Sequence, residues 1–339
     1  MSLTRSGAAT TPRYGAARTA LVWPGALLLL AVAVALGVAL GTVNLTPAQV
    51  IDGLFDRGST LDRTIVWDLR VPRVLLAMMV GACLGVCGAL LQGVTRNPLG
   101  DPHILGLTAG AGLAASIVLK TSRDAPASAL VPAAIAGAGV AAVILYGMSF
   151  RGGTSATRLA LSGVAVASLF TAGITTLLVS SNLGTQAALA FLAGGLFGRG
   201  WDDVHVLWPY AAAAVLASLF LARGMNVLAL GDEAAQSLGL SVERTRFIAL
   251  AVATVLAGAS VAVAGMIAFV GLVIPHAGRL LVGDDHRKLI PLSAILGAAL
   301  IVYADLFSRI VEKPVEIPLG IVTAAIGAPV LLYLVRWKT

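Results

Sequence analysis

Charged side chains are scarce in this sequence of 339 residues, and their scarcity excludes an ordinary water-soluble protein. Lysine, arginine, aspartate and glutamate make up 12% of the chain, hydrophobic residues make up 58%, and the mean hydropathy is +0.93. About a quarter of the residues in a typical soluble domain are charged. Because so few charges cannot cover a water-exposed surface of this size, lipid must cover much of the molecule.

Several marks of catalysis are also missing. The sequence has two cysteines, Cys83 and Cys87, which lie four residues apart in an apolar stretch and suit small packing positions. It contains no G-x-x-x-x-G-K-S/T phosphate loop, no H-E-x-x-H and no G-x-S-x-G. We therefore expect no catalytic residue, no metal site and no cofactor bound by this chain. The net charge of +7 comes without a basic run interleaved with aromatics, so we expect no nucleic-acid partner.

Long uncharged stretches are what the sequence does have, and they predict about ten transmembrane helices. The first 18 residues carry Arg5, Arg13 and Arg18, and no charge follows between residues 19 and 51. A span needs about 20 apolar residues, and fewer where protein shields the helix. We expect an all-α membrane protein with a tail over residues 1–20 and one domain over residues 21–339. The remaining uncharged stretches cover residues 74–95, 104–119, 125–150, 159–198, 206–222, 247–275, 289–304 and 317–335.

Two of these uncharged stretches are too long for one transmembrane helix, and we expect each to contain a break. Residues 159–198 are twice the length of a span, so we expect one span followed by a short helix that does not cross. Residues 247–275 should bend at Gly265 or Gly271 and lead into a short helix near residues 272–281. Glycines four apart at Gly81 and Gly85 fit close helix packing.

The distribution of lysine and arginine predicts the orientation. With ten spans, 14 of the 23 basic residues fall on the side that holds both termini, and 9 fall on the other. Short cytoplasmic loops carry an excess of lysine and arginine. We therefore expect a multi-pass protein of the cytoplasmic membrane with both termini in the cytoplasm.

A series of motifs in fixed order resembles the FecCD-type permeases, which are membrane subunits of ABC importers for ferric siderophores, haem and cobalamin. The motifs are Arg70-Val-Pro-Arg73, Gly81-Ala82, Gln92, Asn97-Pro-Leu-Gly-Asp-Pro102, Leu105-Gly106, residues 230–239, residues 269–276 and Glu316-Ile-Pro-Leu-Gly320. The resemblance implies the type II importer architecture with ten helices per subunit. It also implies three kinds of partner: a second permease subunit, which makes a homodimer or a pair with a related permease, two ATPase subunits that bind ATP and Mg, and a periplasmic or lipid-anchored substrate-binding protein.

Residues 230–240 are expected to form a short cytoplasmic helix. Asp232 can cap its first turn, and Gly239 can supply the left-handed residue that ends it. Ala234, Ala235 and Leu238 would then share one small apolar face, which could enter a groove of a partner or pack on its own bundle. The resemblance implies that this segment receives the ATPase stroke, through Gly231, Asp232, Glu233, Ala234, Ala235, Leu238 and Gly239.

Three arginines are expected at the opposite side of the membrane. Arg70 and Arg73 lie one turn apart at the start of a helix, where they could anchor in headgroups or dock acidic residues of the binding protein. The resemblance implies that Arg309 is a third docking position. Asp305 lies four residues before Arg309, so we expect an intramembrane ion pair between them.

Four residues match positions near the cytoplasmic constriction of the family and are candidate gate residues: Asn97, Leu99, Ser155 and Thr157. Similar sequences near residues 104–111 and 318–328 indicate a weak inverted repeat. We expect a permease for a metal chelate, with ferric siderophore ahead of haem or cobalamin. A carrier driven by an ion gradient is the alternative, although the membrane-centre acids that it would need are scarce.

Overall fold

Helices are the only regular elements in the described part of the chain. A computed structural model describes residues 16–122, 124–149, 156–180, 191–313 and 315–338. The helices are α1 (Ala16–Ala39), α2 (Pro47–Leu54), α3 (Thr60–Arg63), the π-helical η1 (Thr64–Arg70), α4 (Val71–Thr95), α5 (Leu107–Thr121), α6 (Ala127–Ser149), α7 (Ala156–Ser180), α9 (Trp201–Leu228), α10 (Asp232–Ser237), α11 (Val242–Ala264), α12 (Val270–Val282), α13 (His286–Ile310) and α14 (Leu319–Lys338).

The number of long helices agrees with the sequence. Ten of the described helices have 13 residues or more, which are α1, α4, α5, α6, α7, α9, α11, α12, α13 and α14. Six segments among the described residues are long and apolar enough to cross a membrane, and the other four contain shorter apolar helices of 10–17 residues. The all-α, multi-spanning fold predicted from composition is confirmed.

The break predicted after residue 247 lies at Gly265. That glycine has φ of +68°, a left-handed conformation that glycine adopts without a steric penalty, and it ends α11. Gly271 lies inside the next helix, α12. The short helix expected after the span of residues 159–198 falls mostly outside the described residues.

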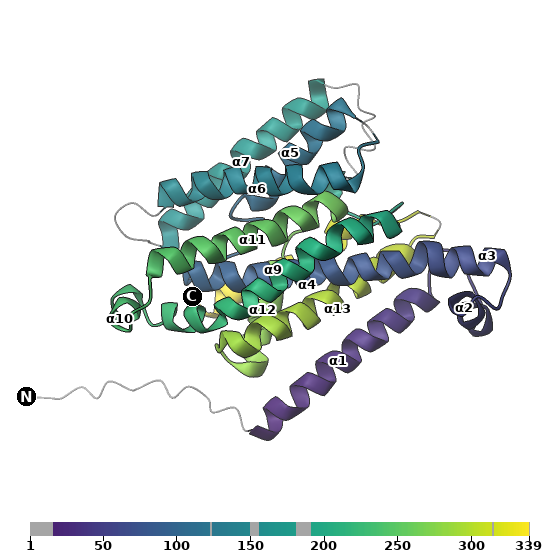
Figure 1. The fold of residues 1–339 in the computed structure, drawn as a ribbon, viewed down its shortest axis with the longest axis horizontal. Coiled ribbons are helices and arrows are strands. Elements are labelled where there is room, and N and C mark those ends of the chain that lie inside the picture. The colour runs from purple at the N-terminus through teal and green to yellow at the C-terminus, as the bar shows by residue number, and fades with distance from the viewer. Residues whose placement is uncertain (1–15, 123, 150–155, 181–190, 314, 339) are drawn as a thin grey trace, which may run out of the picture.

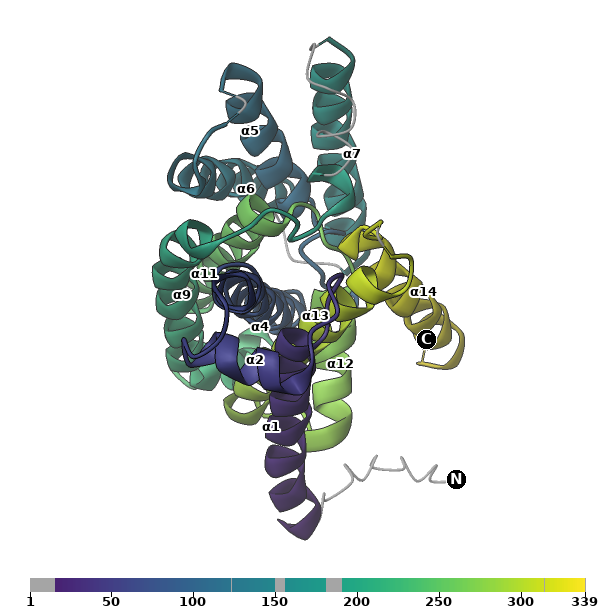
Figure 2. The same ribbon diagram turned by 90° about the vertical axis from the view of Figure 1, so that its right-hand side faces the viewer.

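The helix α4 forms the centre of the bundle. It packs against α9, α11, α12 and α13, while α5, α6 and α7 form a separate layer on one side (Figure 1). Viewed along the bundle, α14 and α1 lie at the periphery (Figure 2). In the most apolar window of the segment containing α4, 78% of the residues are buried, against 17% for α1. Protein therefore surrounds α4, whereas α1 presents most of its surface outward.

Glycines allow α4 to cross α13 at very short range. A Cβ atom added to Gly81 would lie 2.1 Å from the carbonyl oxygen of Gly297, and one added to Gly297 would lie 2.2 Å from the carbonyl oxygen of Gly81. At Gly85 the added atom would lie 2.4 Å from the Ser293 carbonyl oxygen. The predicted close packing at Gly81 and Gly85 is therefore present, and it requires the absence of a side chain.

We expect Gly81→Ala to lower the stability of the permease by about 1–3 kcal/mol, because the two backbones must move apart. The matched control is Gly139→Ala in α6, where an added Cβ meets nothing within 4 Å. That change should be neutral or slightly stabilising, since alanine is the better helix former by about 1 kcal/mol. Thermal unfolding in detergent compares the two, and equal midpoints would contradict the packing account.

The bundle has two distinct ends. One, which we call the α3 end, holds α2, α3 and the start of α4 (Figure 1). The other, the α10 end, holds α10 and the connection from α4 to α5 (Figure 1). The sequence-predicted site residues divide between these two ends.

Candidate functional site

Glycines define the helix at the α10 end. Gly231 precedes α10 with φ of +103°, and Gly239 follows it with φ of +80°. Both values fall in the region that favours glycine. The predicted end at Gly239 is thus present, but Asp232 is the first helical residue, and the cap position belongs to Gly231.

The carboxylate of Asp232 joins α10 to two long helices. Its Oδ1 atom accepts hydrogen bonds from Arg96 Nη2 at 2.6 Å and from Arg246 Nη2 at 2.7 Å. Arg96 is the C-cap residue of α4. Arg246 lies in the first turns of α11 and has 3% of its surface exposed. Arg246 Nη1 also approaches Glu243 Oε1 at 3.3 Å. Any displacement of α10 therefore acts on α4 and α11 through charge-assisted hydrogen bonds.

Sequence reasoning missed Arg96 and Arg246. Arg96 is separated from Asp232 by 136 residues, so neither helix periodicity nor local spacing indicates the contact. Arg96 has a left-handed backbone with φ of +48°, which is unusual for a residue other than glycine, and nothing in the sequence signals it.

The faces of α10 differ in part from the prediction. Ala235 is fully buried against its own chain, whereas Ala234 is exposed and Leu238 is 66% exposed. The expectation that all three share one outward face is wrong for Ala235, since the six-residue helix uses that position to pack on the bundle. Glu233 is also exposed. The surface open to a partner consists of Ala234, Leu238 and their neighbours.

The gate candidates are only partly described. The side chain of Asn97 accepts a hydrogen bond from the backbone N–H of Leu99 at 2.9 Å, which fixes a turn after α4. Ser155 and the side chain of Thr157 lie outside the described residues. A role of these four residues in gating stays a prediction.

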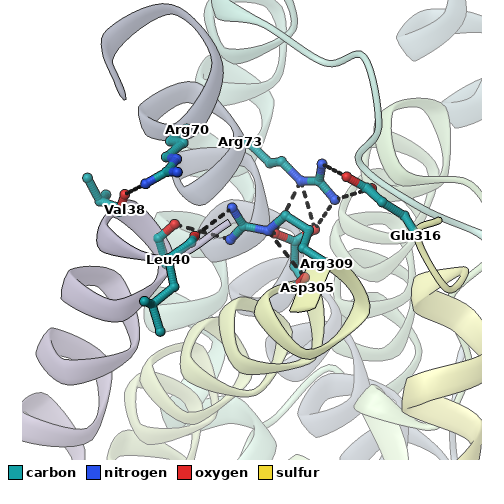
Figure 3. Close-up of polar contacts among 8 residues, drawn as sticks. Val38, Leu40, Arg70, Arg73, Asp305, Arg309 and Glu316 are labelled. Atoms are coloured by element: carbon teal, nitrogen blue, oxygen red, sulfur yellow. Dashed lines mark hydrogen bonds and ion pairs between the residues drawn. The ribbon is translucent and has the colours of Figure 1, made fainter. Parts of the chain in front are cut away.

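At the α3 end, Arg73 bridges two carboxylates that come from distant parts of the chain (Figure 3). Its Nε and Nη2 atoms donate to Asp305 Oδ1 at 2.9 and 2.8 Å. Its Nη1 and Nη2 atoms donate to the two carboxylate oxygens of Glu316 at 2.9 and 2.8 Å. The planar guanidinium group thereby connects α4, α13 and the segment before α14.

Arg309 forms the ion pair that the sequence predicts. Its Nε atom lies 3.0 Å from Asp305 Oδ2, and both side chains are at most 4% exposed. The remaining donors reach α1, where Nη2 contacts the Gly37 carbonyl oxygen at 3.2 Å and Nη1 contacts that of Leu40 at 3.3 Å. Asp305 thus lies between two buried arginines.

Arg70 binds the same end of α1. It donates to the carbonyl oxygens of Val38, Ala39 and Val43 at 2.9, 2.7 and 2.5 Å. The last carbonyls of a helix have no partners within it and carry the negative end of the helix dipole. Two arginines from other helices therefore cap α1 and hold its end to the bundle.

The three arginines at the α3 end are less accessible than anchoring in headgroups or docking to a partner would require. Arg70 and Arg309 are 5% and 3% exposed, and the side chain of Arg73 is 11% exposed. Because their donors bind groups of the same chain, the three arginines hold the α3 end together. Docking of a binding protein by them stays a prediction, and it would require some of these contacts to open.

A cavity of about 540 Å³ lies beside this cluster. Arg73, Arg199 and Glu316 contribute charged groups to its wall, and Phe191, Phe197 and Pro318 contribute apolar ones. The cluster is therefore in contact with a cavity that has both basic and acidic groups in its wall.

Comparison with known proteins assigns the fold to a family. The profile of the FecCD transport family matches residues 28–337. The iron(3+)-hydroxamate import system permease protein FhuB of Bacillus subtilis is 40% identical over 330 residues, covering 96% of this chain and 85% of the relative. The ferric enterobactin transport system permease protein FepD of Escherichia coli is 39% identical, covering 94% of this chain and 96% of the relative.

A cobalamin relative and a solved structure agree with these matches. The cobalamin import system permease protein BtuC of Halobacterium salinarum is 44% identical, over 81% of this chain and 74% of its own. The solved structure of a metal-chelate type ABC transporter in an inward-facing conformation superposes with a TM-score of 0.82 at 28% identity, covering 94% of this chain and 99% of the other. With the family profile matched along nearly the whole chain and ten long helices in the described part, this multi-pass membrane protein belongs to the FecCD transport family.

Proposed function

We propose that this chain is the membrane permease of an ATP-driven importer and that its cargo is a ferric siderophore. The observation that carries the proposal is the family match over residues 28–337. Relatives with 35–40% identity bear names that include iron(3+)-hydroxamate, Fe(3+)-citrate and ferric enterobactin. Cobalamin, named for one relative, and haem are alternatives that would use the same mechanism.

The proposed complex has two permease subunits, two ATPase subunits that hold ATP and Mg, and a substrate-binding protein. The chain is a transport component, and the sequence has no phosphate loop with which to bind ATP itself. We infer that the α10 end and both termini face the cytoplasm. The excess of basic residues in the loops of that side supports this orientation.

In this complex α10 receives the ATPase stroke. Two observations support the role: Leu238 and Ala234 are exposed at the surface, and Asp232 ties the helix to α4 and α11. Because α4 runs from Arg96 to the Arg73 cluster, movement of α10 can reach the α3 end along one helix. The binding protein would dock at that α3 end, beside the charged cavity.

Replacing Leu238 by Asp should separate the permease from its ATPase without unfolding it. Leu238 is 66% exposed, so a charge there meets water in the isolated chain but would be desolvated in a partner's groove. We expect at least about tenfold weaker ATPase association, equivalent to 1.4 kcal/mol. Gln236→Asp is the control, since Gln236 is exposed on the opposite flank of α10. Normal ATPase association in a pull-down assay, together with normal uptake, for the Leu238 variant would rule out the exposed face of α10 as the ATPase contact.

A further inference from the structure

An apolar groove runs along the outside of the bundle between α9 and α11. Its volume is about 620 Å³. The small side chains of Ala213 and Ala217 in α9 and of Ala251 in α11 keep the groove open. Phe247 and Val255 form part of its walls. Both helices are long and apolar enough to span a membrane, and Phe247 in the groove wall is 62% exposed. The groove therefore opens on the outer surface of the chain at the depth of the hydrocarbon region.

Two arginines lie beyond one end of this groove, on the two helices that form it. Arg244 precedes Phe247 and Ile248, which line the groove, by three and four residues, so it lies on the same face of α11 one turn nearer the α10 end. On α9, Gly224 touches α11 there, because an added Cβ would lie 3.2 Å from Thr245 Cγ2. Arg223 and Arg244 are the sequence neighbours of these two contacting residues. The pair therefore flanks the point where the helices meet.

Both arginines are available to a ligand. Arg223 and Arg244 are exposed, and neither has an ion pair or a side-chain hydrogen bond within the parts of the chain that the structure describes. Two acidic groups at this end are already bound: Glu243 accepts from Tyr146 and Arg246, and Asp232 accepts from Arg246. Glu233, in α10, is exposed to solvent. Two uncompensated positive charges thus lie at the membrane boundary beside an apolar groove.

The apolar groove and the arginine pair together fit one amphiphilic molecule with a negatively charged head group. A guanidinium group binds phosphate oxygens through paired, charge-assisted hydrogen bonds. Arg244 lies in the first turn of α11, so its side chain leans toward the N-terminus of that helix and the headgroup layer. Arg223 lies near the end of α9, and its long side chain can extend to the same layer. An acyl chain would fill the groove, and each methylene removed from water contributes about 0.8 kcal/mol.

We propose that the groove between α9 and α11 binds one anionic phospholipid, with an acyl chain along Ala213, Ala217 and Ala251 and the phosphate held by Arg223 and Arg244. A transmembrane helix of another protein could fill the apolar part. Only the lipid supplies the acyl chain and the negative group at fixed separation, which matches the groove and its arginine pair. The site is distinct from the α10 surface and from the Arg73 cluster.

Native mass spectrometry of the purified permease, titrated with phosphatidylglycerol or phosphatidylcholine, tests the proposal. We expect a single high-affinity phosphatidylglycerol adduct, with phosphatidylcholine at least about tenfold weaker. The double variant Arg223→Gln with Arg244→Gln should lose that preference. The matched control is Arg287→Gln with Lys288→Gln, which removes two exposed basic residues at the start of α13 and should keep it.

Groove-filling variants test the acyl chain separately from the head. Ala213→Leu and Ala217→Phe should each weaken binding of both lipids about tenfold or more, and two variants guard against a local folding defect in one. Three outcomes would overturn the proposal: equal affinity for the two lipids, unchanged phosphatidylglycerol binding in the Arg223/Arg244 variant, or groove-filling variants that alter only self-association. None of these outcomes depends on the proposed cargo or on the ATPase.

Discussion

Uptake should fall at least about tenfold when Asp232 is replaced by Asn, while the complex continues to hydrolyse ATP. The substitution removes the charge that binds Arg96 and Arg246 at 2.6 and 2.7 Å. A hydrogen bond to a charged group contributes about 1.5–3 kcal/mol, so losing this link makes the position of α10 poorly coupled to α4. ATP hydrolysis and transport would then become separate events.

A double-mutant cycle distinguishes the link from a general defect. Arg96→Gln alone should reproduce much of the loss, and adding Asp232→Asn to it should cost little more, because both remove the same interaction. Gln236→Ala is the control, since Gln236 is exposed in the same short helix and is not among the residues assigned to coupling. The measurement is uptake per ATP hydrolysed in reconstituted vesicles. A normal ratio in the Asp232 variant would refute transmission through this contact.

Asp305→Leu should reduce the free energy of unfolding by about 3–5 kcal/mol, because removing one partner leaves buried charges uncompensated. Asp305 is 1% exposed and is bound by both Arg73 and Arg309. Without it, two guanidinium groups would remain buried beside each other, with only Glu316 and the α1 carbonyls to satisfy them. The end of α1 should become more mobile as well, because the ion pair with Asp305 holds Arg309 where it donates to the α1 carbonyl oxygens.

Two comparisons make this result specific. Adding Arg309→Met to Asp305→Leu should recover part of the loss, since it removes one of the two unpaired charges. Glu312→Gln changes an exposed carboxylate near the same end and should stay within about 0.5 kcal/mol of wild type. Denaturation in detergent reports all three. A loss below 1 kcal/mol for Asp305→Leu would show that the cluster contributes little to holding the helices.

Periodicity and hydropathy predicted the fold well because they act locally. Uncharged stretches located the long helices, and one of the two glycines considered for the break, Gly265, ended α11. The i,i+4 spacing of Asp305 and Arg309 predicted their ion pair. Each of these depends on residues close together in sequence. The inverted repeat, the domain limits and the gate stay predictions.

The tertiary contacts of the site could not be predicted in the same way. Arg73 is 232 residues from Asp305 and 243 from Glu316, so its burial depends on how α4 meets α13. A sequence-based reading predicts that an arginine at the start of a helix is exposed, because hydropathy does not indicate which face of the helix packs against protein. The orientation of Ala235 was predicted wrongly for a related reason: a helix of only six residues is too short for a periodic pattern that distinguishes its inner face.

Uptake of radioactive iron chelate into vesicles that contain the permease, its ATPase and its binding protein tests the central claim most directly. We predict that internal ATP drives uptake of a ferric siderophore, that an ion gradient alone does not, and that Leu238→Asp abolishes it. Ferric hydroxamate, ferric citrate, haem and cobalamin compared in the same vesicles would rank the cargo. Uptake that persists without ATP and collapses with the ion gradient, or transport of none of these chelates, would contradict the assignment.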